Sequence, residues 1–221
     1  MGERGTKPQG KVKIKWSPNF AYAVGLLVTD GNLSKDGRHI DFTSKDKEQI
    51  LNFMRCLNMK VKIGNKKSGT KQRTSRSQFG DVLFYRFLIS IGLFPNKSKT
   101  LGEIKIPSKY LFDFLRGHFD GDGTFYSYWD PRWRSSFMFY TEFISASRDH
   151  ILWIRKIIDN LLGIKGHITT NKRSSVFQLK YAKEESLKLL PMLYYNKHAV
   201  HLARKREKIE KALKVTGLRL R

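Results

Sequence analysis

Four blocks of this 221-residue sequence occur twice, in the same order. The blocks are FAYAVGLLVTDGNL (20–33), DFTSKDKEQILNF (41–53), LNMKVKI (57–63) and FYRFLISIGLFPNK (84–97), and their copies are YLFDFLRGHFDGDGTF (110–125), EFISASRDHILWI (142–154), LGIKGHI (162–168) and FQLKYAKEESLKLLPMLYYNK (177–197). A displacement of roughly 90 to 105 residues between ordered copies indicates an internal duplication. The chain must therefore fold into two similar halves.

Local patterns predict a mixture of helices and strands in each half, an α+β fold. A glycine ends the first predicted helix at Gly31, and apolar spacing predicts an amphipathic second helix. The polar stretch 65–78 is predicted to be a long loop. The predicted helices are 20–30, 46–57, 88–93, 109–122, 147–161, 184–195 and 199–214, and the predicted strands lie within 32–44 and at 60–64, 81–87, 124–130, 136–145, 165–170 and 176–181.

Domain boundaries follow from the duplication and from two prolines. Pro95 and Pro107 bracket a connecting segment between the copies. We predict a flexible basic lead-in at 1–16, an N-terminal half at 17–97, a linker at 98–107 and a C-terminal half at 108–221 that ends in a basic helix.

The charge balance indicates a polyanionic partner. The sequence has 43 Lys+Arg against 19 Asp+Glu, a formal net charge of +24, spread from Lys11 to Arg221. A folded basic surface is favoured over a basic tail. A single cysteine, Cys56, excludes a disulfide framework within the chain and fits a reducing intracellular compartment, and the apolar runs predict neither a signal peptide nor a membrane span.

The two Asp-Gly sequences at the predicted helix ends could form a metal site. A helix end concentrates partial negative charge, and Asp30 with the Thr29 carbonyl, or Asp122 with the Gly121 carbonyl, adds oxygen ligands suited to Mg²⁺. Asp-Gly is also an ordinary helix stop. The duplication, the charge and the matched glycines of the two helices favour the catalytic interpretation.

The matched glycines Gly25 and Gly117 would let the two helices pack closely, which would bring the two aspartates together. Two adjacent carboxylates need cations to stay ionised, and those cations could activate water for phosphodiester hydrolysis. Asp120 has no acidic counterpart in the first copy, because it matches Val28. We predict a local hydrogen-bonding role for Asp120.

The stretches AVGLLVTDG (23–31) and LRGHFDGDG (115–123) resemble the two signature helices of single-chain LAGLIDADG homing endonucleases. The resemblance covers about residues 17 to 213. It implies two αββαββα halves whose saddle-shaped antiparallel sheets straddle a DNA major groove. It also implies cleavage of both strands across the minor groove with Mg²⁺, or with Mn²⁺ or Ca²⁺ at the same sites, leaving 3′ overhangs. Asp30 and Asp122 are then the metal-binding acids.

The resemblance also implies basic residues around the active centre. Ser44 and Lys45 match Ser145 and Ala146 of the second copy, so the halves differ there. A further lysine is expected near the end of each half: Lys97 or Lys99 in the first, with Lys99 preferred, and Lys205 in the second. For Lys45, Lys99 and Lys205 a phosphate contact and a catalytic role both remain open.

Strands flanking the two signature helices are predicted to read DNA, because a two-stranded ribbon fits the major groove. Leu33, Ile40, Phe42, Phe125, Phe137 and Phe143 should face the helices. The opposite face and the loops give the predicted DNA contacts: Asn32, Ser34, Arg38, Asp41, Thr43, Ser44, Lys66, Lys67, Lys71, Arg73, Arg76, Thr124, Tyr126, Tyr128, Arg132, Arg134, Glu142, Lys172 and Arg173.

The sequence therefore favours a site-specific double-strand DNA endonuclease. We expect it to act as a monomer with an internal pseudo-two-fold axis and without an obligate protein partner. Two alternatives stay open: an intron RNA maturase, and a non-catalytic DNA-binding protein of the same fold. The retained acid pair Asp30 and Asp122 favours cleavage over both.

Overall fold

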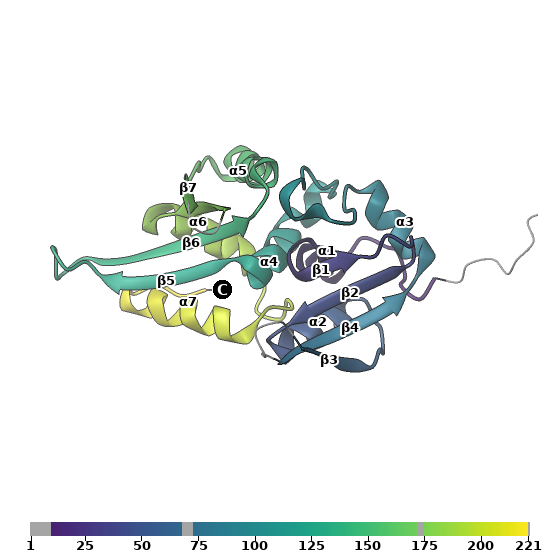
Figure 1. Ribbon diagram of the computed structural model, residues 1–221. Helices are drawn as coiled ribbons and strands as arrows, with labels where there is room; N and C mark the ends of the chain where they lie inside the picture. Colours follow the sequence, from purple (N-terminus) through teal and green to yellow (C-terminus); the bar gives the residue numbers. More distant parts are fainter. Residues whose placement is uncertain (1–9, 68–72, 172–174, 221) are drawn as a thin grey trace, which may run out of the picture.

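A computed structural model describes residues 10–67, 73–171 and 175–220 and shows two halves side by side (Figure 1). The first half consists of α1 (Pro18–Asp30), β1 (Gly31–Leu33), β2 (His39–Ser44), α2 (Lys47–Cys56), β3 (Ile63–Lys67), β4 (Arg73–Gly80) and α3 (Val82–Ser90). The second consists of α4 (Leu111–Asp122), β5 (Thr124–Trp129), β6 (Phe137–Ser145), α5 (Arg148–Leu162), β7 (His167–Asn171), β8 (Val176–Tyr181) and α6 (Lys183–Leu193), followed by α7 (Ala203–Val215).

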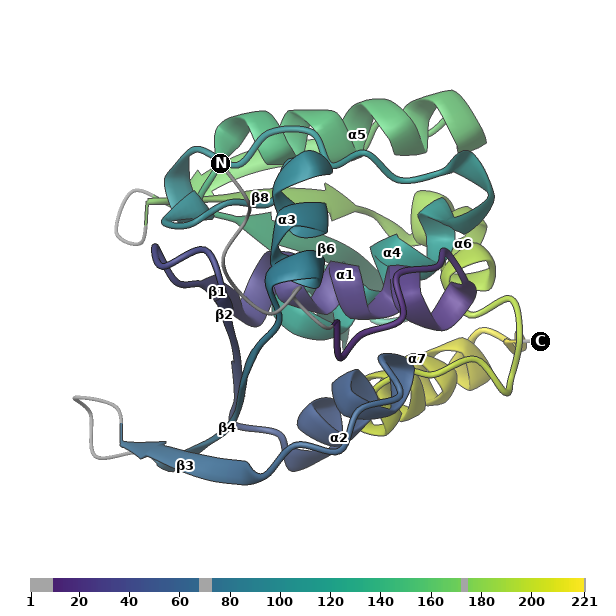
Figure 2. The same cartoon turned by 90° about the vertical axis from the view of Figure 1, so that its right-hand side faces the viewer.

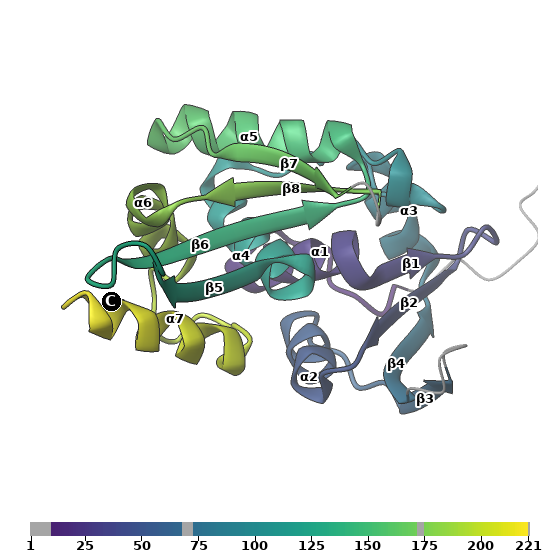
Figure 3. The ribbon, with the colours of Figure 1, turned by 60° about the vertical axis from the view of Figure 1, so that its left-hand side comes forward.

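Each half holds one four-stranded antiparallel sheet. The strand orders are β1-β2-β4-β3 and β5-β6-β8-β7, so the two sheets have the same topology (Figure 3). The order helix, strand, strand, helix, strand, strand, helix is present in both halves. The predicted α+β fold of two αββαββα halves is confirmed.

Helices α1 and α4 pack against each other where the two halves meet (Figure 1). A Cβ atom built on Gly25 would lie 2.2 Å from the Phe114 carbonyl oxygen, and one on Gly117 would lie 2.1 Å from the Tyr22 carbonyl oxygen. Only glycine fits at these two positions. The predicted close approach through Gly25 and Gly117 is confirmed, and it places the ends of α1 and α4 together.

Local sequence explains where α1 begins and ends. The Ser17 hydroxyl accepts a hydrogen bond from the Phe20 amide at 3.1 Å, and Pro18 occupies the first turn, where its missing N–H costs nothing. At the other end the Gly31 amide donates to the Leu27 carbonyl. Asp30 is thus the last residue of α1, and Asp122 has the same place in α4.

The face of each sheet toward the helices is apolar, as predicted. Leu33, Ile40, Phe42, Phe125 and Phe143 are buried, and Phe137 is half-buried against the same core. Because side chains alternate along a strand, the residues between them face the other side of the sheet. The polar candidates for nucleic-acid contact therefore gather on that face.

The prediction for residues 65–93 was wrong in part. The expected strand 81–87 and the expected helix 88–93 are one helix, α3, which Asp81 caps by accepting from the Phe84 amide at 2.9 Å. Much of the expected loop 65–78 is strand: β4 pairs with β2 on one side and β3 on the other. A polar sequence can form this central strand because one of its faces is not covered by helices.

The start of the described chain is bound to the first half. The amides of Lys11 and Val12 donate to the Asp81 carboxylate at 2.7 and 2.9 Å, and Val12 is buried. Residues 11 and 12 therefore do not belong to a flexible lead-in, contrary to the prediction for 1–16. Among the described residues, no helix combines the length and apolar character needed to cross a membrane.

Candidate active site

The carboxylate of Asp30 lies against the end of α4. A Cβ atom built on Gly121 would be 3.1 Å from Asp30 Oδ2 and 1.9 Å from Thr29 Oγ1. The missing side chain of Gly121 thus makes room for the last two residues of α1. The charge of Asp122 acts on Asp30, in keeping with the packing of the ends of α1 and α4.

Burial makes both carboxylates reluctant to ionise, and at Asp30 the charge of Asp122 adds to this effect. Burial, reinforced by the charge of Asp122, raises the pKa of Asp30 to about 6. Burial also raises the pKa of Asp122, although Lys205 and Lys97 oppose that shift. A cation between the two acids would relieve the repulsion and keep both ionised near neutral pH.

Two buried lysines lie beside the acids, one from each half. Lys97 donates to the Gly31 carbonyl, and Lys205 donates to the Gly123 carbonyl at 2.6 Å. Because Gly31 and Gly123 follow Asp30 and Asp122, the two lysines occupy matching places. Burial lowers the pKa of each lysine to about 8, and neighbouring carboxylates oppose both shifts.

Of the two lysines considered in the first half, Lys97 is the one at the centre. Lys97 is 6% exposed, whereas Lys99 is exposed to solvent at the end of the same 3₁₀ turn. The spacing in NKSKTL could not decide between them, because the direction of each side chain depends on this turn. Lys97, and not the preferred Lys99, is therefore the lysine of the first half that lies at the site.

Lys205 is held tightly at the end of α4. Its ammonium group donates to the carbonyls of Phe119 at 2.5 Å, Gly121 at 3.2 Å and Gly123 at 2.6 Å. These three bonds use the three N–H donors of the group. Lys205 therefore offers the site a fixed positive charge.

Gln49 belongs to the site and was not found from the sequence. Its amide donates to Asp30 Oδ2 at 3.2 Å and to the Asp120 carbonyl at 3.3 Å, and Ser44 donates to its carbonyl oxygen at 2.6 Å. Gln49 thus links the two halves at Asp30. The matching residue of the second copy is His150, and this mismatch in the repeat was the available signal.

Asp120 is a hydrogen-bonding residue, as predicted, but its partners are distant in the sequence and not local. It is fully buried and accepts from the Tyr22 hydroxyl at 2.7 Å and from the Leu202 amide at 2.8 Å. Burial raises its pKa, and the charge of Lys205 opposes that shift. Asp120 joins α1, α4 and the chain before α7.

An open depression of about 690 Å³ lies next to Asp30. Lys45 is exposed and lines this depression. The lining residues are Asp30, Thr43, Ser44, Lys45, Asp46, Lys47, Gln49, Thr74, Gly121 and Arg204. A second depression, lined in part by Asp122, Thr124, Lys205 and Lys208, lies between the end of α4 and α7.

The donors at the helix ends fit a hard divalent cation. They are two carboxylates and the carbonyls at positions 29 and 121, all of them oxygen atoms. No set of three or more His, Cys, Asp or Glu within the described ranges is placed to share an ion. An ion bound by Asp30 and Asp122 would thus complete its shell with water and phosphate oxygens, which is typical of Mg²⁺.

The uncovered face of the first sheet carries four of the predicted polar contacts: Asn32, Asp41, Thr43 and Arg76. The register aligns Asn32 with Asp41 and Gln78, and Thr43 with Arg76. Asn32 is exposed, but Asp41 is buried and pairs with Arg76 at 2.7 Å. Arg76, more than Asp41, is therefore the group that can meet DNA.

The second sheet repeats this arrangement with different side chains. Glu142, which matches Asp41 in the repeat, is buried and pairs with Lys180 at 3.0 Å. Next to this pair, the rings of Tyr126 and Tyr128 both stack on the ring of Tyr140, with distances between ring centroids of 5.2 and 6.3 Å. Lys180 was not among the predicted contacts. The alternation of apolar and polar residues in VFQLKY (176–181) was the available signal, because it places Lys180 on the uncovered face.

The remaining predicted contacts lie in several places. Ser44 is buried and faces Gln49, and the Ser34 carbonyl accepts from Tyr85. Lys66, Lys67 and Arg73 lie in β3 and β4, whereas Lys71, Lys172 and Arg173 fall outside the described residues. Of these remaining predicted contacts, four are exposed to solvent: Arg38, Thr124, Arg132 and Arg134.

Comparison with solved structures identifies relatives of the fold. The structure of the I-LtrWI LAGLIDADG homing endonuclease bound to target DNA matches with a TM-score of 0.60, 12% identity and 90% of each chain covered. The meganuclease I-SmaMI bound to uncleaveable DNA matches with a TM-score of 0.61, 12% identity and coverage of 92% of this chain and 91% of that one.

A third match is the N-terminal LAGLIDADG domain of DUF199/WhiA, with a TM-score of 0.55, 18% identity and coverage of 89% of this chain and 88% of that one. No protein-family model and no curated protein sequence matches this chain. At these identities the similarity shows the LAGLIDADG-like fold, which the signature stretches had suggested.

Proposed function

We propose that the protein is a site-specific endonuclease that hydrolyses both strands of DNA with a divalent metal ion. One observation carries the proposal: the packed ends of α1 and α4 hold two carboxylates, each next to a buried lysine, between two sheets with polar faces. A fold alone does not require such an arrangement. Two carboxylates that repel each other destabilise the empty site, which is typical of functional centres.

The residues have separate roles in this proposal. Asp30 and Asp122 hold the metal ions, with the carbonyls of Thr29 and Gly121 as further ligands. When bound, the metal lowers the pKa of a water and stabilises charge on the phosphate. Lys205 contributes a fixed positive charge at the end of α4, where it offsets the two acids. Lys97 has the same role in the first half.

Double-stranded DNA is the proposed substrate. The chain carries a formal charge of +24, and I-LtrWI and I-SmaMI were both solved with DNA. The uncovered faces of the two sheets would read base edges with Asn32, Arg76 and Lys180. One chain supplies both halves, so we propose a monomer.

Two other functions use the same fold. The second candidate is a DNA-binding protein that does not cleave. The similarity to the LAGLIDADG domain of DUF199/WhiA, which is not described as an endonuclease, supports it. An intron RNA maturase remains an outcome that the experiment can reveal. The acid pair distinguishes these functions, because binding alone does not need two repelling carboxylates.

The test is a selection of cleaved sites from a random library of double-stranded DNA. The protein is incubated with the library and Mg²⁺, and ends are captured and sequenced. We expect one recovered site with short 3′ overhangs, and no recovered ends with Asp30→Asn, Asp122→Asn or a chelator. Both variants should still shift the recovered site in a gel. Binding without cleavage by the wild type would favour the DNA-binding alternative, and exclusive binding to a structured RNA would favour the maturase.

A further inference from the structure

The two buried lysines have a second feature in common. Lys97 lies in segment 97–102, which follows α3, the last helix of the first half. Lys205 lies in segment 201–205, which follows α6 and includes the start of α7. In both cases the second helix of the opposite half holds the backbone of that segment. Figure 2 shows α2 of the first half beside α7, which begins just after residue 202.

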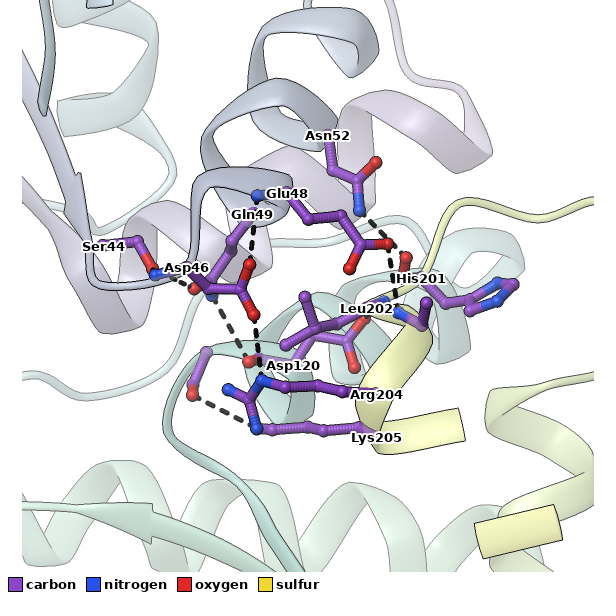
Figure 4. A network of polar contacts seen from close by, with 12 residues as sticks. Ser44, Asp46, Glu48, Gln49, Asn52, Asp120, His201, Leu202, Arg204 and Lys205 are labelled. Carbon is purple, nitrogen blue, oxygen red and sulfur yellow. Dashed lines mark hydrogen bonds and ion pairs between the residues drawn. The ribbon is translucent and has the colours of Figure 1, made fainter. Parts of the chain in front are cut away.

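Segment 201–205 is held by α2 through three side chains (Figure 4). Asn52 donates to the His201 carbonyl at 2.9 Å, and Glu48 accepts from the Ala203 amide at 3.1 Å. Asn52 is buried and Glu48 is half-buried. These two side chains fix the chain direction directly before Lys205.

Two further contacts continue this attachment. Asp46, the residue that caps α2, pairs with Arg204 at 2.9 Å. The Lys205 amide donates to the Leu202 carbonyl at 3.1 Å, so the position of Lys205 depends on the residues that α2 holds. From there the side chain of Lys205 returns to the end of α4 in its own half.

Segment 97–102 is held by the cap and the first turn of α5, through other positions of the repeat. The Ser147 hydroxyl donates to the Leu101 carbonyl at 2.5 Å, and His150 Nδ1 lies 2.7 Å from the Gly102 carbonyl oxygen. The Leu101 amide donates to the Lys97 carbonyl at 2.8 Å. Ser147 and His150 are both buried. In the repeat they match Asp46 and Gln49 of the first half.

We propose that α2 and α5 position the two lysines reciprocally: Glu48 and Asn52 of the first half fix Lys205, and Ser147 and His150 of the second half fix Lys97. This inference rests on the proposed function and adds positioning residues to it. A lysine side chain has four rotatable bonds and favours water, so a held backbone lowers the entropic cost of keeping the ammonium group buried beside a carboxylate. The crossed attachment means that each cleavage centre is complete only when both halves are docked.

The first experiment measures the reactivity of each lysine and does not depend on cleavage. The full-length protein is treated with a limiting amount of an amine acetylating reagent, and modification of Lys97 and Lys205 is followed by peptide mass spectrometry. In Glu48→Ala we expect Lys205 to react about tenfold faster, the effect of losing one well-placed hydrogen bond, while Lys97 is unchanged. In Ser147→Ala we expect the opposite result: Lys97 should react faster while Lys205 is unchanged.

Two control variants keep the result specific. Glu48→Gln retains an acceptor oxygen and should behave as the wild type. Leu51→Ala changes an exposed residue of the same helix and should alter neither lysine. Within each variant the other lysine reports on general loosening. Equal acceleration of both lysines, or no acceleration of either, would overturn the positioning role.

The second experiment measures the consequence for cleavage on the DNA site recovered by the selection. Each strand is labelled separately, and single-turnover rates are determined for the two alanine variants. We expect Glu48→Ala and Ser147→Ala to slow opposite strands, with little change in DNA affinity. Slowing of the same strand by both would refute the inference. If the wild type cuts nothing, the proposed function fails, and the labelling result still decides the positioning of the lysines.

Discussion

Replacing Gly25 by alanine should destabilise this protein, although the same exchange inside an isolated helix stabilises it. Alanine is favoured over glycine in a helix interior by about 1 kcal/mol. Here the new methyl group would lie 2.2 Å from the Phe114 carbonyl oxygen and 2.7 Å from the His118 amide nitrogen. Both obstacles are backbone atoms of α4, which no rotamer change can move.

The size of the effect follows from the distances. To reach an ordinary contact of 3.4 Å, α1 and α4 must separate by roughly 1.2 Å, because the clash points directly at the other helix. Overpacking of this kind costs about 3 kcal/mol or somewhat more. After subtraction of the helix preference, we expect a net loss of about 2 kcal/mol, or about 4–8 °C in Tm for a chain of this length.

The assay is urea unfolding followed by tryptophan fluorescence, with Gly117→Ala as the reciprocal change. A methyl group at position 117 would lie 2.1 Å from the Tyr22 carbonyl oxygen, so this change should give a similar loss. Gly64→Ala in β3 is the matched control, because its nearest neighbour would be the Arg76 carbonyl oxygen at 3.9 Å. If Gly25→Ala or Gly117→Ala is as stable as the wild type, the helices do not meet through these glycines.

Three further predictions concern charge. DNA affinity should fall steeply between low and high salt while Asp30→Asn leaves it intact, as measured by fluorescence anisotropy; a nearly flat salt dependence would contradict a large phosphate interface. Lys45→Ala should slow the cleavage of one strand about 10²–10⁴-fold more than that of the other, because Ala146 occupies the matching place in the second half. Equal slowing of both strands in a time course with labelled strands would mean that Lys45 only contacts a phosphate. The pKa of Asp30 is raised from 3.8 to about 6 in the folded protein, so ionisation of Asp30 opposes folding. The metal-free protein should therefore lose stability as the pH rises from about 4 to about 6, and Asp30→Asn should remove part of that loss in denaturant titrations at the two pH values. An unchanged dependence of stability on pH in Asp30→Asn would argue against burial of this carboxylate.

Features that repeat within the sequence were predictable, because two copies confirm each other. The packing of Gly25 against α4, and the meeting of Asp30 with the second helix, followed from aligning the two copies. The error at 81–90 has a physical cause: VLFYRFLIS is apolar on nearly every side, so its period did not distinguish a strand from a buried helix. The capping aspartate at position 81 was the better signal.

Features outside the aligned blocks were predicted only in part. Lys205, and the pair Lys97 or Lys99, were expected from the family resemblance. The repeat could not decide between Lys97 and Lys99, because the lysines of the two halves do not occur at equal distances from their motifs and their side chains are placed by turns and by the opposite half. Gln49 was missed for a related reason: its partners Asp30 and Asp120 come together only through the packing of α1 on α4. The polar strand β4 was taken for a loop because nothing in RTSRSQFG shows that two strands pair with it.

The two centres of the site are unequal, and the inequality lies in one position of the repeat. At Asp30, Gln49 connects the carboxylate to the Asp120 carbonyl of the other half, and Lys45 lies at the wall of the same depression. At the matching place in the second half, His150 turns toward the Gly102 carbonyl and holds segment 97–102. The residue that contacts an acid in one half therefore contacts a backbone support in the other.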